Sequence, residues 1–174
     1  GLESRGLGDV YKRQREGSAF YDFFNPDRIV IGGSDQKGLN QCTELYESFD
    51  CEKIITDSNS SQMIKYLSNT YLAMRLSFVN ETYRLVSEFS GNPEEVLNAI
   101  GKDKRIGNDY FRPSPGWGGS CFPKDVKEVI SSFQMDYQLP IISEILRSNE
   151  LHMEWFVDYI PVSYTHLRAH ETLV

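Results

Sequence analysis

Residues 25–56, NPDRIVIGGSDQKGLNQCTELYESFDCEKIIT, contain the pattern that decides the fold of the first part of the chain. The turn residues Asn25-Pro26-Asp27 precede the apolar run 29–31, which predicts a buried strand. Residues 36–49 carry apolar side chains at helical spacing, and 53–56 form a second short β-branched run. Strand, helix and strand in this order predict one parallel crossover of an α/β sheet.

The next stretch predicts a long helix over about residues 60–89, capped by Asp57 or Ser58. Some 30 residues at 1.5 Å each extend roughly 45 Å. Apolar residues form two rows along this helix. The first row consists of Ile64, Leu67, Tyr71, Met74, Phe78, Leu85 and Phe89. The second row consists of Leu72, Leu76, Val79, Tyr83 and Val86. Two apolar faces predict a helix covered on both sides, as in a connector between domains or subunits.

Three further helices are predicted toward the end of the chain. Asn92 as cap, Pro93 at the first position and Gly101 at the end define a helix over 92–101. Helices are also expected over 123–133 and 140–159, with a break around residues 136–140. The fold class is therefore α/β followed by a mostly α-helical part.

Composition narrows the functional class. The chain has 174 residues, of which 40% are hydrophobic and 25% charged, with a formal net charge of -7. An acidic chain without a basic stripe argues against nucleic acid as a partner. No apolar run is long enough to span a membrane. The three cysteines lack CxxC spacing, which argues against a metal site and favours a reducing, cytoplasmic location, with Cys42 and Cys51 as packing residues.

The two ends differ in character from the middle of the chain. Residues 1–14 and 162–174 resemble adaptor sequence read through in frame, so both are expected to be non-native tails outside the fold. His166 and His170 lie in the second of them. The remaining histidine, His152, is expected to be structural or on the surface.

The stretch Gly116-Trp-Gly-Gly-Ser-Cys-Phe-Pro-Lys-Asp125 carries the candidate chemistry. Gly118-Gly119 can adopt backbone angles closed to other residues and admit a ligand close to the main chain. Pro123 suits a first helical position and Asp125 falls in the first turn. Cys121 stands just ahead of that helix, where the helix dipole and Lys124 favour its thiolate and hence its nucleophilicity. The alternative for any cysteine is a small buried hydrophobe.

The string GWGGSCFPKD resembles the active-site signature of the UDP-glucose/GDP-mannose dehydrogenase family, whose members oxidise a nucleotide sugar's primary alcohol to a carboxylate with NAD. The resemblance implies that 15–57 end a Rossmann-type NAD-binding domain. It implies that 58–161 form a long connecting helix and a helical central domain that makes a homodimer through that helix. The dinucleotide fingerprint GxGxxG is absent and is expected upstream.

The resemblance also implies the site residues. Cys121, Lys65, Asn69 and Asp125 are the expected catalytic residues, with MIKYLSN as the segment that carries the lysine and asparagine. The expected substrate-binding residues are Glu16, Lys65, Asn69, Arg105, Tyr110, Phe111, Arg112, Gly116 and Gly118, and the expected cofactor-binding residues are Glu16, Cys121 and Lys124. An i,i+4 polar pair such as Lys65 and Asn69, or a lone loop arginine, is otherwise typical of a solvent-facing surface.

Two positions depart from the family pattern. Lys12 stands where a second glutamate is expected, and Ser60-Ser61 occur where many relatives have a glutamate. Gly-Ser-Cys rather than Gly-His-Cys argues against UDP-N-acetylhexosamine substrates and favours UDP-glucose. The alternatives are a GDP-mannose 6-dehydrogenase, or a helical dimerisation fragment without activity of its own.

Overall fold

A computed structural model of the chain describes residues 9–12, 19–132 and 139–171. The chain divides into two compact units, Gly1–Leu67 and Ser68–Val174, which meet within one long helix. Glu16 lies outside the described residues.

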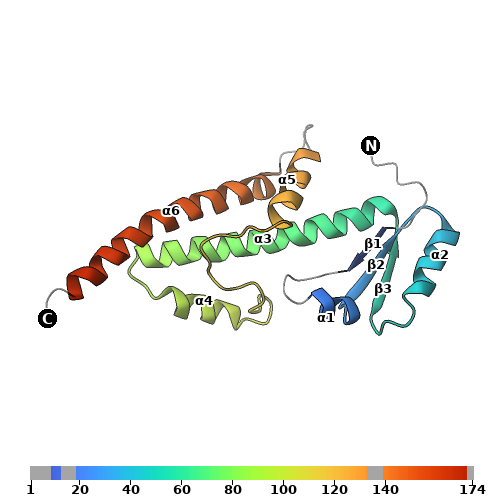
Figure 1. Ribbon diagram of the computed structural model, residues 1–174, viewed down its shortest axis with the longest axis horizontal. Helices are drawn as coiled ribbons and strands as arrows, with labels where there is room; N and C mark the ends of the chain where they lie inside the picture. Colours follow the sequence, from blue (N-terminus) through green and yellow to red (C-terminus); the bar gives the residue numbers. More distant parts are fainter. Residues whose placement is uncertain (1–8, 13–18, 133–138, 172–174) are drawn as a thin grey trace. The chain divides into compact units, whose positions relative to one another are not determined.

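The first unit is built on a three-stranded sheet in the order β1-β2-β3 (Figure 1). Strand β2 (Arg28–Gly32) pairs in parallel with β3 (Glu52–Thr56), and helix α2 (Gln36–Leu45) connects them. The β-branched side chains of β2 are fully buried, and Ile29 and Ile31 pack against Leu39 of α2. Cys42 and Cys51 pack against the same cluster, as expected from their apolar setting. The predicted parallel crossover is therefore confirmed.

The structure corrects two expectations in this unit and adds a helix. Strand β1 (Asp9–Lys12) pairs antiparallel with β2, although 1–14 were expected to lie outside the fold. This strand has only four residues, too few to show an alternating pattern, and its pairing partner lies further along the chain. Helix α2 ends at Leu45 rather than at 49. Phe49, which continued the predicted apolar pattern, packs against the same core from the turn that follows the helix. Helix α1 (Ala19–Phe24) was not predicted.

Helix α3 (Ser58–Glu88) has the predicted length and the predicted start. The Asp57 carboxyl accepts hydrogen bonds from the Ser60 amide at 2.9 Å and the Ser60 hydroxyl at 2.6 Å, which lowers the pKa of Asp57. At the other end, Ser90 rather than Gly91 takes the left-handed conformation, with φ 56°. The Gly91 amide donates to the Val86 carbonyl at 2.9 Å, which completes a Schellman cap.

The second unit packs three helices around the remainder of α3 (Figure 1). These are α4 (Pro93–Gly101), α5 (Phe122–Ser132) and α6 (Pro140–Glu171). One core joins Ala73, Trp117, Val126 and Ile145, and another joins Val79, Leu97 and Phe111. The Asn92 side chain accepts from the amides of Glu94 and Glu95, so the predicted cap of α4 is confirmed.

Two features of this unit differ from the sequence expectation. Helix α6 continues to Glu171, into the stretch 162–174 that was expected to lie outside the fold. On α3, the second apolar row is buried or half-buried, whereas most of the first row is exposed, including Tyr71, Phe78 and Leu85. Among the residues that the structure describes, the second row is therefore covered, and the first is covered only in part. None of the helices that the structure describes is long and apolar enough to cross a bilayer.

Candidate active site

Cys121 lies at the start of α5, as the sequence predicts. Its carbonyl oxygen accepts the first hydrogen bond of the helix from the Asp125 amide at 2.9 Å. The thiol is exposed, and its sulfur lies 3.6 Å from the Ser120 hydroxyl oxygen. The alternative of a small buried hydrophobe is therefore wrong for this cysteine. An exposed thiol at a helix N-terminus is available to an electrophilic carbon.

Asp125 is almost fully buried, with 1% of its surface exposed. Its Oδ2 accepts a hydrogen bond of 2.6 Å from Nδ2 of Asn69. Oδ1 has no hydrogen-bond partner within the described structure, although Nζ of Lys124 lies 3.8 Å away. A buried carboxyl oxygen without a donor is unusual. It is an acceptor without a protein donor among the described residues, at which a buried water molecule can bind.

Asn69 and Asp125 thus come together in the second unit. The two predicted lysines, Lys65 and Lys124, do not share this hydrogen bond. Lys124 is largely exposed on the first turn of α5. Lys65 belongs to the first unit, and its Nζ lies 5.4 Å from the centre of the Tyr66 ring.

The glycines before Cys121 differ from one another. Gly119 has φ 81° and Gly116 has φ 149°, whereas Gly118 is outside the positive-φ region, so of the pair Gly118-Gly119 only Gly119 uses this conformational freedom. A Cβ atom on either Gly118 or Gly119 would have no neighbour within 4 Å. The main chain next to Cys121 is therefore open to a ligand, as predicted.

The loop that precedes the glycines brings some of its predicted site residues into the core. Phe111 is buried beside Val79 and Leu97, and the Arg75 guanidinium lies 5.1 Å from its ring centre. Arg75 also donates to the carbonyl oxygens of Ile106 and Gly107. Tyr110 adopts a left-handed conformation with φ 54°. Phe111 therefore holds the loop in place by packing.

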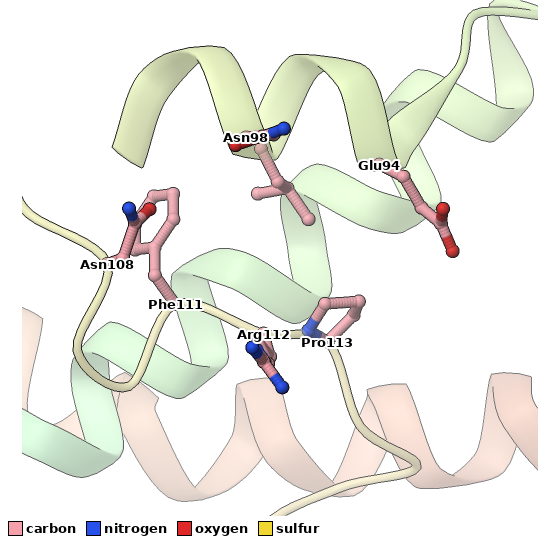
Figure 2. A pocket seen from close by; sticks show the side chains of 7 residues that line it. Glu94, Asn98, Asn108, Phe111, Arg112 and Pro113 are labelled. Carbon is pink, nitrogen blue, oxygen red and sulfur yellow. The ribbon is translucent and has the colours of Figure 1, made fainter. Parts of the chain in front are cut away.

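Arg105 and Arg112 occupy different surroundings. Arg105 is exposed and pairs with Asp103 at 2.6 Å, which lowers the pKa of Asp103 and raises the pKa of Arg105. Arg112 lines a cavity of about 600 Å³ between α4 and the loop (Figure 2). The other lining residues are Glu94, Leu97, Asn98, Asn108, Phe111 and Pro113. Neither Cys121 nor Asp125 lines this cavity.

Sequence reasoning missed three buried polar residues on α3 and α6, Ser77, Asn80 and Asn149, whereas His152 is buried near them in the structural role that was one of its two expectations. Asn80 accepts from the Ser114 amide at 2.9 Å, and Nε2 of His152 lies 2.8 Å from the Ser114 carbonyl oxygen. Asn149 and Ser77 contact Trp117. Burial lowers the pKa of His152, as does Arg84, while the Ser114 carbonyl and Glu81 oppose the shift. The one sequence signal for this group is the occurrence of Ser77 and Asn80 among apolar neighbours of the long helix.

The model of the UDP-glucose/GDP-mannose dehydrogenase family, central domain, matches residues 59–151, which is more than half of the chain. The chain belongs to the UDP-glucose/GDP-mannose dehydrogenase family. The NAD binding domain model of the same family matches residues 11–50, so NAD is the cofactor of this family member. This match begins inside the stretch that was expected to be a non-native tail.

Several similar proteins are named UDP-glucose 6-dehydrogenase. UDP-glucose 6-dehydrogenase YwqF of Bacillus subtilis is 38% identical over 145 residues, 83% of this chain and 33% of that protein. UDP-glucose 6-dehydrogenase of Rhizobium meliloti is 40% identical over 132 residues, 73% of this chain and 30% of that protein. The chain therefore spans about a third of the length of the curated relatives it matches.

Solved structures of family members have the same fold. A UDP-glucose dehydrogenase from Pyrobaculum islandicum aligns with a TM-score of 0.80 at 37% identity, over 84% of this chain and 34% of that one. A GDP-mannose dehydrogenase from Pseudomonas aeruginosa aligns with a TM-score of 0.55 at 29% identity, over 90% and 37%. The predicted fold class, the end of a NAD-binding domain followed by a helical central domain, is confirmed.

Proposed function

We propose that this chain supplies the reactive thiol and the surrounding helical part of a NAD-dependent UDP-glucose 6-dehydrogenase. Such an enzyme oxidises the C6 alcohol of UDP-glucose to the carboxylate of UDP-glucuronate. The observation that carries the proposal is the exposed Cys121 at the N-terminus of α5, one helical turn before a buried Asp125 that is hydrogen-bonded to Asn69. A nucleophile beside a held polar pair suits covalent oxidation of an aldehyde.

The reaction proceeds through a covalent stage on Cys121. Loss of a hydride and a proton first converts the alcohol to an aldehyde. The thiolate then adds to the aldehyde carbon, and the carbonyl electron pair moves to oxygen to give a thiohemiacetal oxyanion. Loss of a second hydride yields a thioester, and attack by water releases the carboxylate and returns the thiolate. NAD, when bound, accepts the hydrides.

The proposal assigns the remaining steps of the reaction to other residues of the chain. Asp125 and Asn69 hold and orient the attacking water, a role that suits the free acceptor Oδ1 of Asp125. Lys65 stabilises the oxyanions. Cys121, Lys124 and Glu16 would contact the nicotinamide end of the cofactor. The open main chain at Gly118 and Gly119 fits a planar group beside the thiol, because no side chain fills that space.

The loop before Cys121 is proposed to bind the nucleotide sugar. Its backbone at Gly116 and Gly118 would lie along the substrate, while Tyr110, Phe111 and Arg112 shape the loop and Arg105 contacts the diphosphate. A pairing with Asp103 leaves the Arg105 guanidinium exposed and able to exchange partners. UDP-glucose is favoured over GDP-mannose because the UDP-glucose dehydrogenase structure is the more similar of the two comparisons above.

We also propose that the chain forms a homodimer through α3. Several side chains of the first apolar row on α3, which include Tyr71, Phe78 and Leu85, are exposed. Exposed apolar side chains of this kind are typical of a helix that packs against a partner. The segment by itself is expected to reduce no NAD, since the GxGxxG fingerprint is absent from its sequence.

The test uses a full-length enzyme in which residues 15–161 replace the matching segment of the Bacillus subtilis relative. Cys121→Ser should stop the reaction at the aldehyde, because a hydroxyl adds to it far less readily than a thiolate. Cys42→Ser, a packing cysteine of the first unit, is the matched control and should retain carboxylate formation. Undiminished UDP-glucuronate from the Cys121→Ser enzyme would refute the proposal.

A further inference from the structure

The segment from Ser114 to Trp117, which leads toward Cys121, is held by side chains of two helices. Asn80 of α3 accepts from the Ser114 amide at 2.9 Å, and His152 of α6 contacts the Ser114 carbonyl at 2.8 Å. Asn149 of α6 and Ser77 of α3 bind Trp117. A loop without a strand or helix partner has thus satisfied its backbone groups with fixed side chains.

Asn149 makes two of these contacts, both with the backbone of Trp117. Its Oδ1 accepts from the Trp117 amide at 2.9 Å, and its Nδ2 donates to the Trp117 carbonyl at 2.8 Å. One buried amide therefore takes both polar groups of one residue, as a neighbouring strand would. Gly116 allows this approach, since a Cβ there would lie 3.3 Å from Oδ1 of Asn149 and 2.5 Å from Cγ of Met153.

The Trp117 side chain contacts both α3 and the residue that follows Cys121. Its indole Nε1 donates to the Ser77 hydroxyl at 2.8 Å, with both side chains buried. Its ring meets the ring of Phe122 edge-on, with 6.2 Å between the centroids. Phe122 is the residue that follows Cys121 and the first residue of α5. Trp117 therefore connects α3 and α6 to the end of the loop where the thiol lies.

The residues between Trp117 and Cys121 have no comparable anchors. Gly118 and Gly119 would meet nothing within 4 Å even with a Cβ added, and Ser120 is exposed. The position of the sulfur is thus determined from the two ends of this short segment, by Trp117 on one side and by α5 on the other.

We propose that Asn149 and Ser77 are positioning residues for the thiol step, which they control by fixing Trp117. This inference rests on the proposed function. Neither residue contacts the substrate; their role is to keep Cys121 within reach of the aldehyde carbon. The thiol step is the one that a displaced loop should impair, because a displacement of about 1 Å can cost roughly 10²-fold in rate.

A merely structural role would have a different consequence. Partial unfolding lowers the concentration of active enzyme and therefore reduces both oxidation steps equally. A displaced thiol slows the second step alone, so aldehyde is released before it is captured. The ratio of trapped aldehyde to carboxylate separates these two effects.

The experiment uses the chimeric full-length enzyme with UDP-glucose, NAD and hydroxylamine as the aldehyde trap. Asn149→Leu removes both hydrogen bonds at similar volume, and Ser77→Ala independently removes the indole contact with little change in size. Each should raise the ratio of oxime to UDP-glucuronate by at least about tenfold and lower kcat for carboxylate formation, with KM changed by less than about threefold.

Two further variants make the result decisive. Ile100 packs in the other core of the second unit, beside Val79 and Leu97. Ile100→Ala should therefore lower the melting temperature without changing the ratio of oxime to UDP-glucuronate. Cys121→Ser reports on the proposed function itself and should give oxime alone. The positioning role is overturned if Cys121→Ser gives oxime but the other variants do not raise the ratio of oxime to UDP-glucuronate. In that case Ser77→Ala and every folded Asn149 variant would have the same ratio as Ile100→Ala. If Cys121→Ser still makes UDP-glucuronate, the proposed function fails instead.

Discussion

Asn69 donates a hydrogen bond of 2.6 Å to Asp125, 56 positions further along the chain. This contact joins the long helix α3 to the first turn of α5, whose N-terminus carries Cys121. It also explains how a carboxyl group with 1% exposed surface is tolerated in the second unit.

Removing the donor of this pair should destabilise the second unit. Asn69→Leu leaves the Asp125 carboxyl buried without its hydrogen bond, at a cost of about 1.5–3 kcal/mol in the free energy of unfolding. Asp125→Asn should cost less, because an amide oxygen can still accept from Asn69 and carries no charge. Urea denaturation of both variants and of the double variant measures the coupling. Additive losses would mean that the two side chains do not interact.

Gly116→Ala and Gly118→Ala should separate stability from ligand access. At Gly116 the added Cβ would lie 2.5 Å from Cγ of Met153 at φ 149°, so we expect a loss of about 1–3 kcal/mol. At Gly118 the space is open and φ is ordinary, so unfolding should change by less than about 0.5 kcal/mol. The KM for UDP-glucose of the chimeric enzyme should nevertheless rise with Gly118→Ala. Equal melting temperatures for the two variants would contradict this prediction.

Stability should decrease as the pH falls through the range in which histidine titrates. Burial lowers the pKa of His152 in the folded chain, below its usual value of 6.5. The unfolded chain therefore takes up the proton first, so the stabilisation is complete above about pH 6.5 and is lost as the pH falls toward the folded pKa.

The measurement is urea denaturation between pH 7.5 and 5.5. Both the reference chain and the test chain carry His166→Gln and His170→Gln, so that only His152 can titrate among the histidines. His152→Gln keeps a possible donor to the Ser114 carbonyl and should flatten the pH dependence. An unchanged slope in that variant would assign the effect to other groups.

Leu85→Glu should shift the chain from dimer to monomer. Leu85 is exposed on the first apolar row of α3, and a charge there would have to be buried in the proposed homodimer. Sedimentation equilibrium over a range of protein concentrations measures the shift. Glu95→Gln, an exposed change on α4 and therefore away from the α3 surface, is the control and should leave association unchanged. If the Leu85→Glu chain dimerises as strongly as the unchanged chain, the interface lies elsewhere.

Much of the secondary structure could be predicted because its signals are local. The caps at Asp57 and Asn92 satisfy amides within three residues, and the apolar periods of α3 and β2 follow from one element's own geometry. Strand β1 and the end of α2 could not be predicted in this way. The first depends on pairing with a distant strand, and the second on a core contact that Phe49 makes from a turn.

The sequence by itself determined that Cys121 stands at a helix N-terminus behind glycines, since proline, glycine and capping residues specify that geometry over a few positions. Only the tertiary structure decided that Asn69 faces Asp125, that Asn149 and Ser77 hold Trp117, and that the first apolar row of α3 is covered only in part. An isolated polar residue on a helix has the same local pattern whether it faces water or a buried partner. The choice between them depends on how helices distant in sequence pack together.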